Sequence, residues 1–180
     1  MTTAQPPVQG ALFDVETDRT DPLIGYRGPT VCQIAGITYR QLDYWTRTGL
    51  IEASVTAAAG SGSQRLYSFR DILLIKIIKS LLDAGISLQN VRKALTYLDA
   101  RKVEDLAGLT LMSDGTTVYE CRSAEEIVDL LAGGQGVFGL AVPGLLAELT
   151  GSITAFPSQR ADAPAPVDEL AARRAAKATA

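Results

Sequence analysis

Histidine is absent from this chain of 180 residues, and cysteine occurs only twice. Without an imidazole the chain has no Ser-His or Cys-His pair, no imidazole metal ligand and no Cys2His2 finger. Cys32 and Cys121 lie far apart in the sequence, and two thiolates cannot make a four-ligand site. We therefore expect no metal and no other cofactor, two reduced and buried thiols, and a protein that is not an enzyme.

Long hydrophobic runs are also missing. The most apolar stretch, residues 72–82, is interrupted by Lys76, Lys79 and Ser80 and is much shorter than a membrane span. The first 18 residues contain no Lys or Arg and no apolar run, so no secretory signal is visible. These absences predict a soluble cytoplasmic protein without a membrane partner. The hydrophobic share of 47% is nevertheless enough for a folded core.

The formal net charge of −3 conceals an uneven distribution along the chain. Residues 26–100 carry nine basic against five acidic side chains, whereas the segments before and after them are acidic. Within the basic block, Arg40, Arg47 and Arg65 fall where other signals predict a turn, a helix and a hairpin. The block is either a DNA-facing patch or a solvated helical face, and charge alone does not decide between them.

Local signals divide the chain into five segments. Residues 1–25 have acidic side chains and no periodicity, which indicates a flexible acidic arm. Residues 26–98 contain the helical signals described next, and a polar joint follows at 99–108. Residues 109–156 have alternating strand and helix signals, and the Ala- and Pro-rich residues 157–180 are typical of a disordered tail.

Two capping boxes open the helical segment. Thr30 with Gln33, and Thr38 with Gln41, each have the spacing at which a hydroxyl and a Gln side chain cap a helix start. Two starts so close together predict a short helix, a tight turn and a second helix that ends at Gly49. The apolar seam between the two helices would consist of Ile34, Ile37, Leu42 and Trp45.

A hairpin and two more helices complete this segment. Residues 50–54 and 64–67 flank a Gly- and Ser-rich tip at 57–63, which predicts a β-hairpin with a long tip. Ser68 caps a strongly apolar helix stopped by Gly85, and Ser87 caps a fourth helix. Helix, turn, helix, hairpin, helix, helix is the order of a winged helix-turn-helix.

The sequence of residues 109–156 predicts a small α+β domain. Strands at 109–112 and 116–121 flank Asp114-Gly115, a strong hairpin signal. Ser123 would cap a short helix, residues 135–142 a third strand, and 143–150 a closing helix. The expected fold is mainly α with small β elements, namely a winged helix-turn-helix followed by a ββαβα domain. That domain is marginal alone unless it pairs with something.

Residues 37–51, ITYRQLDYWTRTGLI, resemble the recognition helix of MerR-type transcription regulators. The shared features are the Thr38 cap, a Leu-x-Tyr-aromatic core and a terminal Gly-Leu. Arg65-Leu66-Tyr67-Ser68 resembles the family's Arg-x-Tyr segment, and Gly85-Ile86-Ser87-Leu88 resembles its Gly-Phe-Ser-Leu. The likeness covers residues 26–98, and it is greatest to an actinobacterial group that shares the YRQLDYW run and has a compact C-terminal domain.

Three features depart from the family pattern. Asp43 stands where the family commonly has Arg, so we expect an internal ion pair in place of one phosphate contact. The wing lacks the usual Arg near residues 54–56, which leaves backbone groups around Gly60 and Ser61 for groove contacts. The long coiled-coil helix of the family is missing, so dimerisation must use the C-terminal domain or another surface.

The resemblance implies promoter DNA as the partner and assigns roles along the chain. Tyr39, Arg40 and Gln41 would reach base edges from the first helical turn, while Tyr44 and Arg47 would contact phosphates. For Gln41 the alternative is helix capping alone, for Tyr44 packing in the seam, and for Tyr67 a core aromatic. The complete set of expected DNA contacts is Thr30, Thr38, Tyr39, Arg40, Gln41, Tyr44, Arg47, Gly60, Ser61, Arg65 and Tyr67.

The C-terminal residues offer weaker expectations. Val137, Phe138, Leu140 and Val142 form an apolar group that either packs in the core, pairs two protomers or lines a pocket for a small-molecule effector. Cys121 has no second cysteine nearby, so the family's mercury and redox sensing is not expected.

The resemblance further implies a homodimer on inverted-repeat sites that bends and untwists the promoter spacer, with repression by occupying the promoter as the alternative mode. The protein would act on RNA polymerase indirectly and would associate with the nucleoid when bound. An excisionase-like architectural factor and a protein-interaction adaptor with a degenerate winged helix are the alternatives. No acid–base pair or phosphate loop supports an enzyme.

Overall fold

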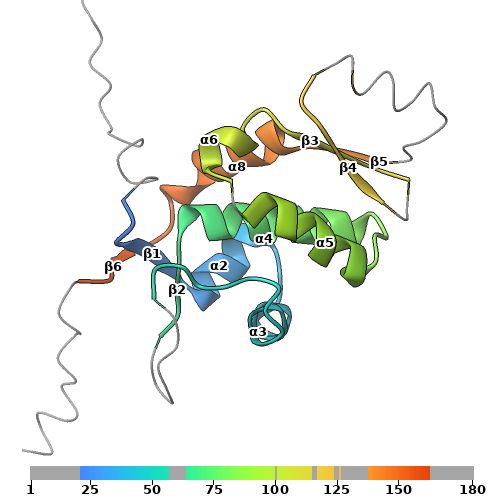
Figure 1. The fold of residues 1–180 in the computed structure, drawn as a ribbon. Coiled ribbons are helices and arrows are strands. Elements are labelled where there is room, and N and C mark those ends of the chain that lie inside the picture. Colours follow the sequence, from blue (N-terminus) through green and yellow to red (C-terminus); the bar gives the residue numbers. More distant parts are fainter. Residues whose placement is uncertain are drawn as a thin grey trace, which may run out of the picture.

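The structure is a computed structural model that describes residues 21–56, 64–99, 101–114, 117–123, 126 and 138–162. Helix α4 (Phe69–Asp83) and helix α5 (Leu88–Asp99) form the middle layer (Figure 1). Helices α2 (Gly28–Ala35) and α3 (Tyr39–Arg47) lie on one side of it. The other side carries α6 (Val103–Leu106), α8 (Val142–Ile153) and a small sheet.

Helix α4 is the centre of the core. Ten of its fifteen residues are buried, including the consecutive run from Asp71 to Ile78. A helix that is apolar around most of its circumference must be covered on several sides, and α4 packs against α2, α5 and α8. The most apolar stretch of the sequence is therefore the central helix of a layered fold.

The predicted caps of α3 and α4 are confirmed. The Thr38 and Ser68 side chains each accept from the backbone N–H three residues on, and Gln41 and Asp71 complete the two boxes. Gly36 has a φ of 65° in the turn between α2 and α3, a left-handed conformation that favours glycine. The predicted seam is also confirmed, because all four of its residues are buried: Ile34, Ile37, Leu42 and Trp45.

The predicted start of α2 is wrong. This helix begins at Gly28 with Pro29 in its first turn, and extended Arg27 precedes it without a side-chain cap. A proline suits a first turn because it has no N–H to satisfy there. Thr30 therefore lies inside the first turn of α2 and does not cap it, which excludes capping as its role.

A three-stranded sheet joins distant parts of the chain in the order β2-β1-β6. Its strands are β1 (Ile24–Arg27), β2 (Leu66–Tyr67) and β6 (Gln159–Arg160). β1 begins inside the segment expected to be an arm, and β6 lies inside the segment expected to be a tail. Their pairing depends on non-local contacts: Arg27 Nε donates to Gln159 Oε1 at 2.7 Å, and Arg160 pairs with Asp21 at 2.8 Å.

The wing hairpin differs from the prediction. Residues 50–54 form no strand, and a single antiparallel bridge between Thr56 and Leu66 closes the base of the wing. Strand β2 pairs instead with β1, where a Cβ on Gly25 would lie only 2.8 Å from the Leu66 Cβ. Glycine at position 25 thus permits the close approach of the two strands. The expected wing tip lies outside the described residues.

A second antiparallel sheet has the order β4-β3-β5. It contains β3 (Thr110–Ser113), β4 (Val118–Cys121) and β5 (Phe138–Ala141), which confirms the predicted hairpin and the third strand. Helix α8 follows β5 directly, with Pro143 in its first turn as expected. The helix predicted after Ser123 lies outside the described residues, so the full ββαβα order stays a prediction.

One core runs through both parts of the molecule. Buried residues of α4 and α5 are continuous with Leu106, Leu109 and Leu149 of the C-terminal part. Lys76 of α4, largely buried, donates through Nζ to Glu148 Oε1 of α8 at 3.0 Å. The small α+β unit, expected to be marginal alone, packs directly against the central helix.

Candidate nucleic-acid interface

Helix α3 has one buried and one exposed face. Leu42 and Trp45 are buried against the core, while Tyr39 is 61% and Tyr44 47% exposed. Arg40 is exposed in the first turn, and the Arg47 side chain is 68% exposed in the last. The exposure of Tyr44 excludes packing in the seam. In Figure 1, α3 lies on the side of α4 opposite to α8 and the β3–β5 sheet.

Gln41 serves the cap of its own helix. Its Oε1 atom accepts from the Thr38 backbone N–H and from the Thr38 hydroxyl, both at 2.9 Å. The Thr38 hydroxyl in turn accepts from the Gln41 N–H at 3.2 Å. Pairing with adenine needs the same Gln oxygen. The arrangement matches the capping alternative that the sequence left open.

Asp43 joins α3 to the strand that leaves the wing. Its Oδ1 lies 3.3 Å from Arg65 Nη1, and its Oδ2 lies 3.5 Å from Arg47 Nε. Each carboxylate oxygen therefore holds a different guanidinium. The sequence suggested an internal ion pair at this departure from the family pattern, and the structure contains two.

Tyr67 is a core residue. Its side chain is buried, and its hydroxyl lies 3.0 Å from the hydroxyl of Thr46. Burial raises the pKa of the Tyr67 hydroxyl, against the opposing effects of Thr46 and the nearby Arg65 guanidinium. Thr46 was not singled out in the sequence, since only the fold brings it to Tyr67. Together they fix β2 against α3.

The remaining expected contacts lie around the start of α2 and in the wing. Thr30 is half-buried in the first turn of α2. The ring of Tyr39 reaches the same place, because a Cβ on Gly28 would lie 3.1 Å from Tyr39 Cε2. Gly60 and Ser61 lie outside the described residues.

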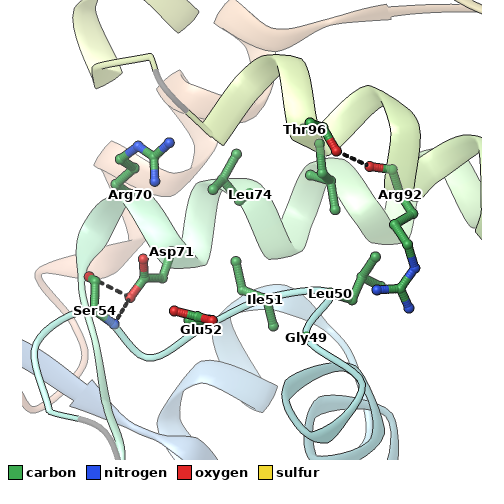
Figure 2. Close-up of a pocket in the computed structure, with 11 residues that line it drawn as sticks. Gly49, Leu50, Ile51, Glu52, Ser54, Arg70, Asp71, Leu74, Arg92 and Thr96 are labelled. Carbon is green, nitrogen blue, oxygen red and sulfur yellow. Dashed lines mark hydrogen bonds between the residues drawn. The ribbon is translucent and has the colours of Figure 1, made fainter.

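A polar network anchors the base of the wing (Figure 2). Asp71 Oδ2 accepts from the Ser54 N–H and hydroxyl, each at 2.8 Å, and from the Ser68 N–H at 2.9 Å. On the opposite side of the pocket, Arg92 donates to the Thr48 carbonyl at the end of α3 at 2.9 Å. The pocket between them has a volume of about 260 Å³. Of this network the sequence revealed only the Ser68–Asp71 box.

The C-terminal candidates separate into two groups. Val142 is fully buried as the first residue of α8, so it belongs to the core. Phe138 and Leu140 are half-buried on β5, where Leu140 pairs with Leu111 of β3. Val137 lies outside the described residues.

Both cysteines carry free thiols. Cys121 is buried as expected, whereas Cys32 is only half-buried, and burial raises the pKa of each thiol. The residues that the structure describes hold no group of three or more potential metal ligands. Among those same residues, no helix is long and apolar enough to cross a membrane.

Two short helices joined by a tight turn, with an exposed basic second helix beside a wing, define a helix-turn-helix module. Residues 26–98 match the family described as MerR HTH family regulatory protein. Proteins named as HTH-type transcriptional regulators of Mycobacterium bovis and of two strains of Mycobacterium tuberculosis are 63% identical over 175 residues. The match covers 95% of this chain and 77% of each relative. The chain belongs to the MerR family of helix-turn-helix proteins.

Proposed function

We propose that this protein is a transcription regulator that binds promoter DNA sequence-specifically as a homodimer. The observation that carries the proposal is the exposed face of α3, where Arg40 and Arg47 stand at opposite ends of one helix and Arg65 lies beside it. Family membership and the names of the relatives support DNA binding and regulation of transcription.

The exposed side chains divide into readers, which would contact base edges, and anchors, which would contact phosphates. Arg40, in the first turn of α3, would contact guanine O6 and N7 in the major groove, beside Tyr39. Tyr44, Arg47 and Arg65 would hold phosphates and fix the register of the helix on the duplex. Gln41 and Tyr67 act indirectly, because Gln41 holds the first turn of α3 and Tyr67 holds the strand that carries Arg65.

The further anchors are weaker. Thr30, at the positive end of the α2 dipole, and the wing backbone at Gly60 and Ser61 would contact flanking phosphates. Thr38 contributes as the cap that orients α3.

The mode of action follows from the dimer. Two copies of α3 about 34–36 Å apart would read an inverted repeat, and bending with untwisting of the spacer would change access by RNA polymerase. Val137, Phe138 and Leu140 of the C-terminal part are proposed for protomer pairing or for a small-molecule effector. Val142 is not, because it is buried in the core.

The test begins with selection of the preferred duplex from a random library by the full chain. Arg40→Ala should lose about 1–3 kcal/mol on the selected duplex and much less on a scrambled one. Arg65→Ala should weaken both duplexes alike and reduce the salt slope by about one, because it removes a phosphate contact. Fluorescence anisotropy at several salt concentrations measures these changes, with the exposed Lys102→Ala of the opposite layer as control.

Three results would contradict the proposal. Equal losses from Arg40→Ala and Arg65→Ala on every sequence would remove the division into readers and anchors. If sedimentation shows a monomer and the footprint covers a single half-site, the proposed homodimer is wrong. The absence of any selected duplex, even in dilute buffer, would instead favour an adaptor that has lost DNA binding.

A further inference from the structure

Asp43 pairs with two of the proposed DNA-binding arginines, Arg47 and Arg65. It is the only acidic residue of α3, and no acid occurs in the adjacent strand segment 64–67. Its side chain is 36% exposed, and that of Arg65 is 28% exposed. The carboxylate therefore lies at the surface, in the angle between the recognition helix and the base of the wing.

Each oxygen of Asp43 lies beside one nitrogen of a guanidinium that is proposed to hold phosphate. Oδ1 faces Arg65 Nη1 at 3.3 Å, and Oδ2 faces Arg47 Nε at 3.5 Å. Carboxylates and phosphates present similar oxygen acceptors to a guanidinium, so they compete for the same N–H groups. A duplex approaching this face must displace the carboxylate or bring a phosphate close to a like charge.

We infer that Asp43 is an intramolecular competitor of the DNA backbone, which lowers the affinity for all sequences alike. The inference rests on the proposed function and adds a residue that sets its strength. Asp43 forms these pairs on the protein surface, where each is weak and easily exchanged. The competition therefore reduces phosphate binding without abolishing it.

The first experiment compares Asp43→Asn with the wild-type chain. The variant should bind the selected and the scrambled duplex about fivefold more tightly at low salt, because one repulsive charge is removed and two arginines are released. The salt slope should steepen by about one, since each additional phosphate contact releases counterions. The ratio of the two affinities should stay constant.

Two controls separate this effect from net charge and from folding. Asp83→Asn removes the same charge from a carboxylate paired with Lys79 at the far end of α4 and should change neither affinity nor slope. In a chain that also carries Arg47→Gln and Arg65→Gln, Asp43→Asn should give a much smaller gain, because only the repulsive charge is then removed. Thermal unfolding of each variant confirms that it is folded.

Two kinds of failure are distinguishable. If the wild-type chain binds DNA and Asp43→Asn binds equally or more weakly, or if Asp83→Asn gives the same gain, the competition is refuted while the proposed function stands. If neither the wild-type chain nor Asp43→Asn binds any duplex in dilute buffer, the proposed function and this inference both fail.

Discussion

At the scale of single residues, Asp71 is a buried carboxylate that depends on its hydrogen-bond donors. It is 2% exposed, and a buried carboxylate is tolerated only when hydrogen-bond donors surround it. Three donors from Ser54 and Ser68 meet one of its oxygens. This residue therefore performs two tasks, since it completes the cap of α4 and holds the backbone that enters the wing.

Replacing Asp71 should destabilise the protein strongly. Asp71→Ala removes the carboxylate that accepts from Ser54 and Ser68, so the cap of α4 and the anchor of the wing base are lost together, which should lower the free energy of unfolding by about 2–3 kcal/mol. Urea denaturation followed by circular dichroism measures the loss. Asp83→Ala, at the exposed end of the same helix, should change it by less than about 0.5 kcal/mol. Similar losses for the two variants would show that the network contributes little.

At the scale of elements, the sequence predicted what depends on neighbours along the chain. The Thr38 and Ser68 caps and the helix-ending glycines are signals within a few residues, and the structure confirms them. The β1–β6 pairing and the position of β2 depend on residues far apart in the sequence, so no local pattern revealed them. At α2, Pro29 determined the start and the Thr30 box did not.

The residues of the candidate site also fall into those that local patterns predicted and those that only the fold brings together. Exposure of Tyr39, Arg40 and Arg47 follows from helical periodicity and could be anticipated. The capping role of Gln41 was visible as an alternative, but spacing alone could not choose it. The Tyr67–Thr46 contact required the fold itself.

The link between α5 and β4 should respond to pH. Arg101, just after α5, donates from Nη1 to Oε1 of Glu120 at 2.6 Å, and its Nη2 lies 2.6 Å from Oε2. Partial burial acts to raise the pKa of Glu120, but hydrogen bonds from Arg122 and Arg101 outweigh it and hold the pKa below its ordinary value. The ion pair therefore stabilises the fold above the unfolded-state pKa of about 4.3 and loses this effect as pH falls through the lower folded-state pKa.

Glu120→Gln should thus unfold at a lower temperature than the wild type at pH 7. The difference should shrink as the pH falls below about 4.3, towards the lowest value at which the wild type still folds. Scanning calorimetry at a series of pH values measures it, with the exposed Glu104→Gln as the control. A difference that is constant with pH would mean that the carboxylate charge is not responsible.

At the scale of the whole molecule, α4 lies between the layer of α2 and α3 and the C-terminal layer (Figure 1). The α2 and α3 helices contact one side of the core, and α8 packs on α4 from the other. Lys76 of α4 has a side chain that is only 9% exposed, and Glu148 of α8 is its partner. The C-terminal part is connected to α3 through this central helix and also through α2, which α8 contacts directly.

Breaking the Lys76–Glu148 pair should loosen the two layers. Glu148→Ala leaves a largely buried ammonium group without its carboxylate, and because Glu148 is itself exposed we expect a loss of about 1–2 kcal/mol. Chemical denaturation gives the value. The double variant Lys76→Met with Glu148→Ala should recover most of it, because no unpaired charge is left in the core. A double variant less stable than Glu148→Ala would contradict this explanation.

The β1–β6 sheet also determines the order in which the molecule can assemble. Arg27 and Gln159 are separated by 132 positions, whereas the β3–β4 hairpin closes over a few. Closing the larger loop costs more chain entropy, so it becomes favourable only after the helices between have condensed. The strand that directly precedes the helix-turn-helix is thus paired late on the folding pathway, and a ribosome must release residues up to Arg160 before that pairing can form.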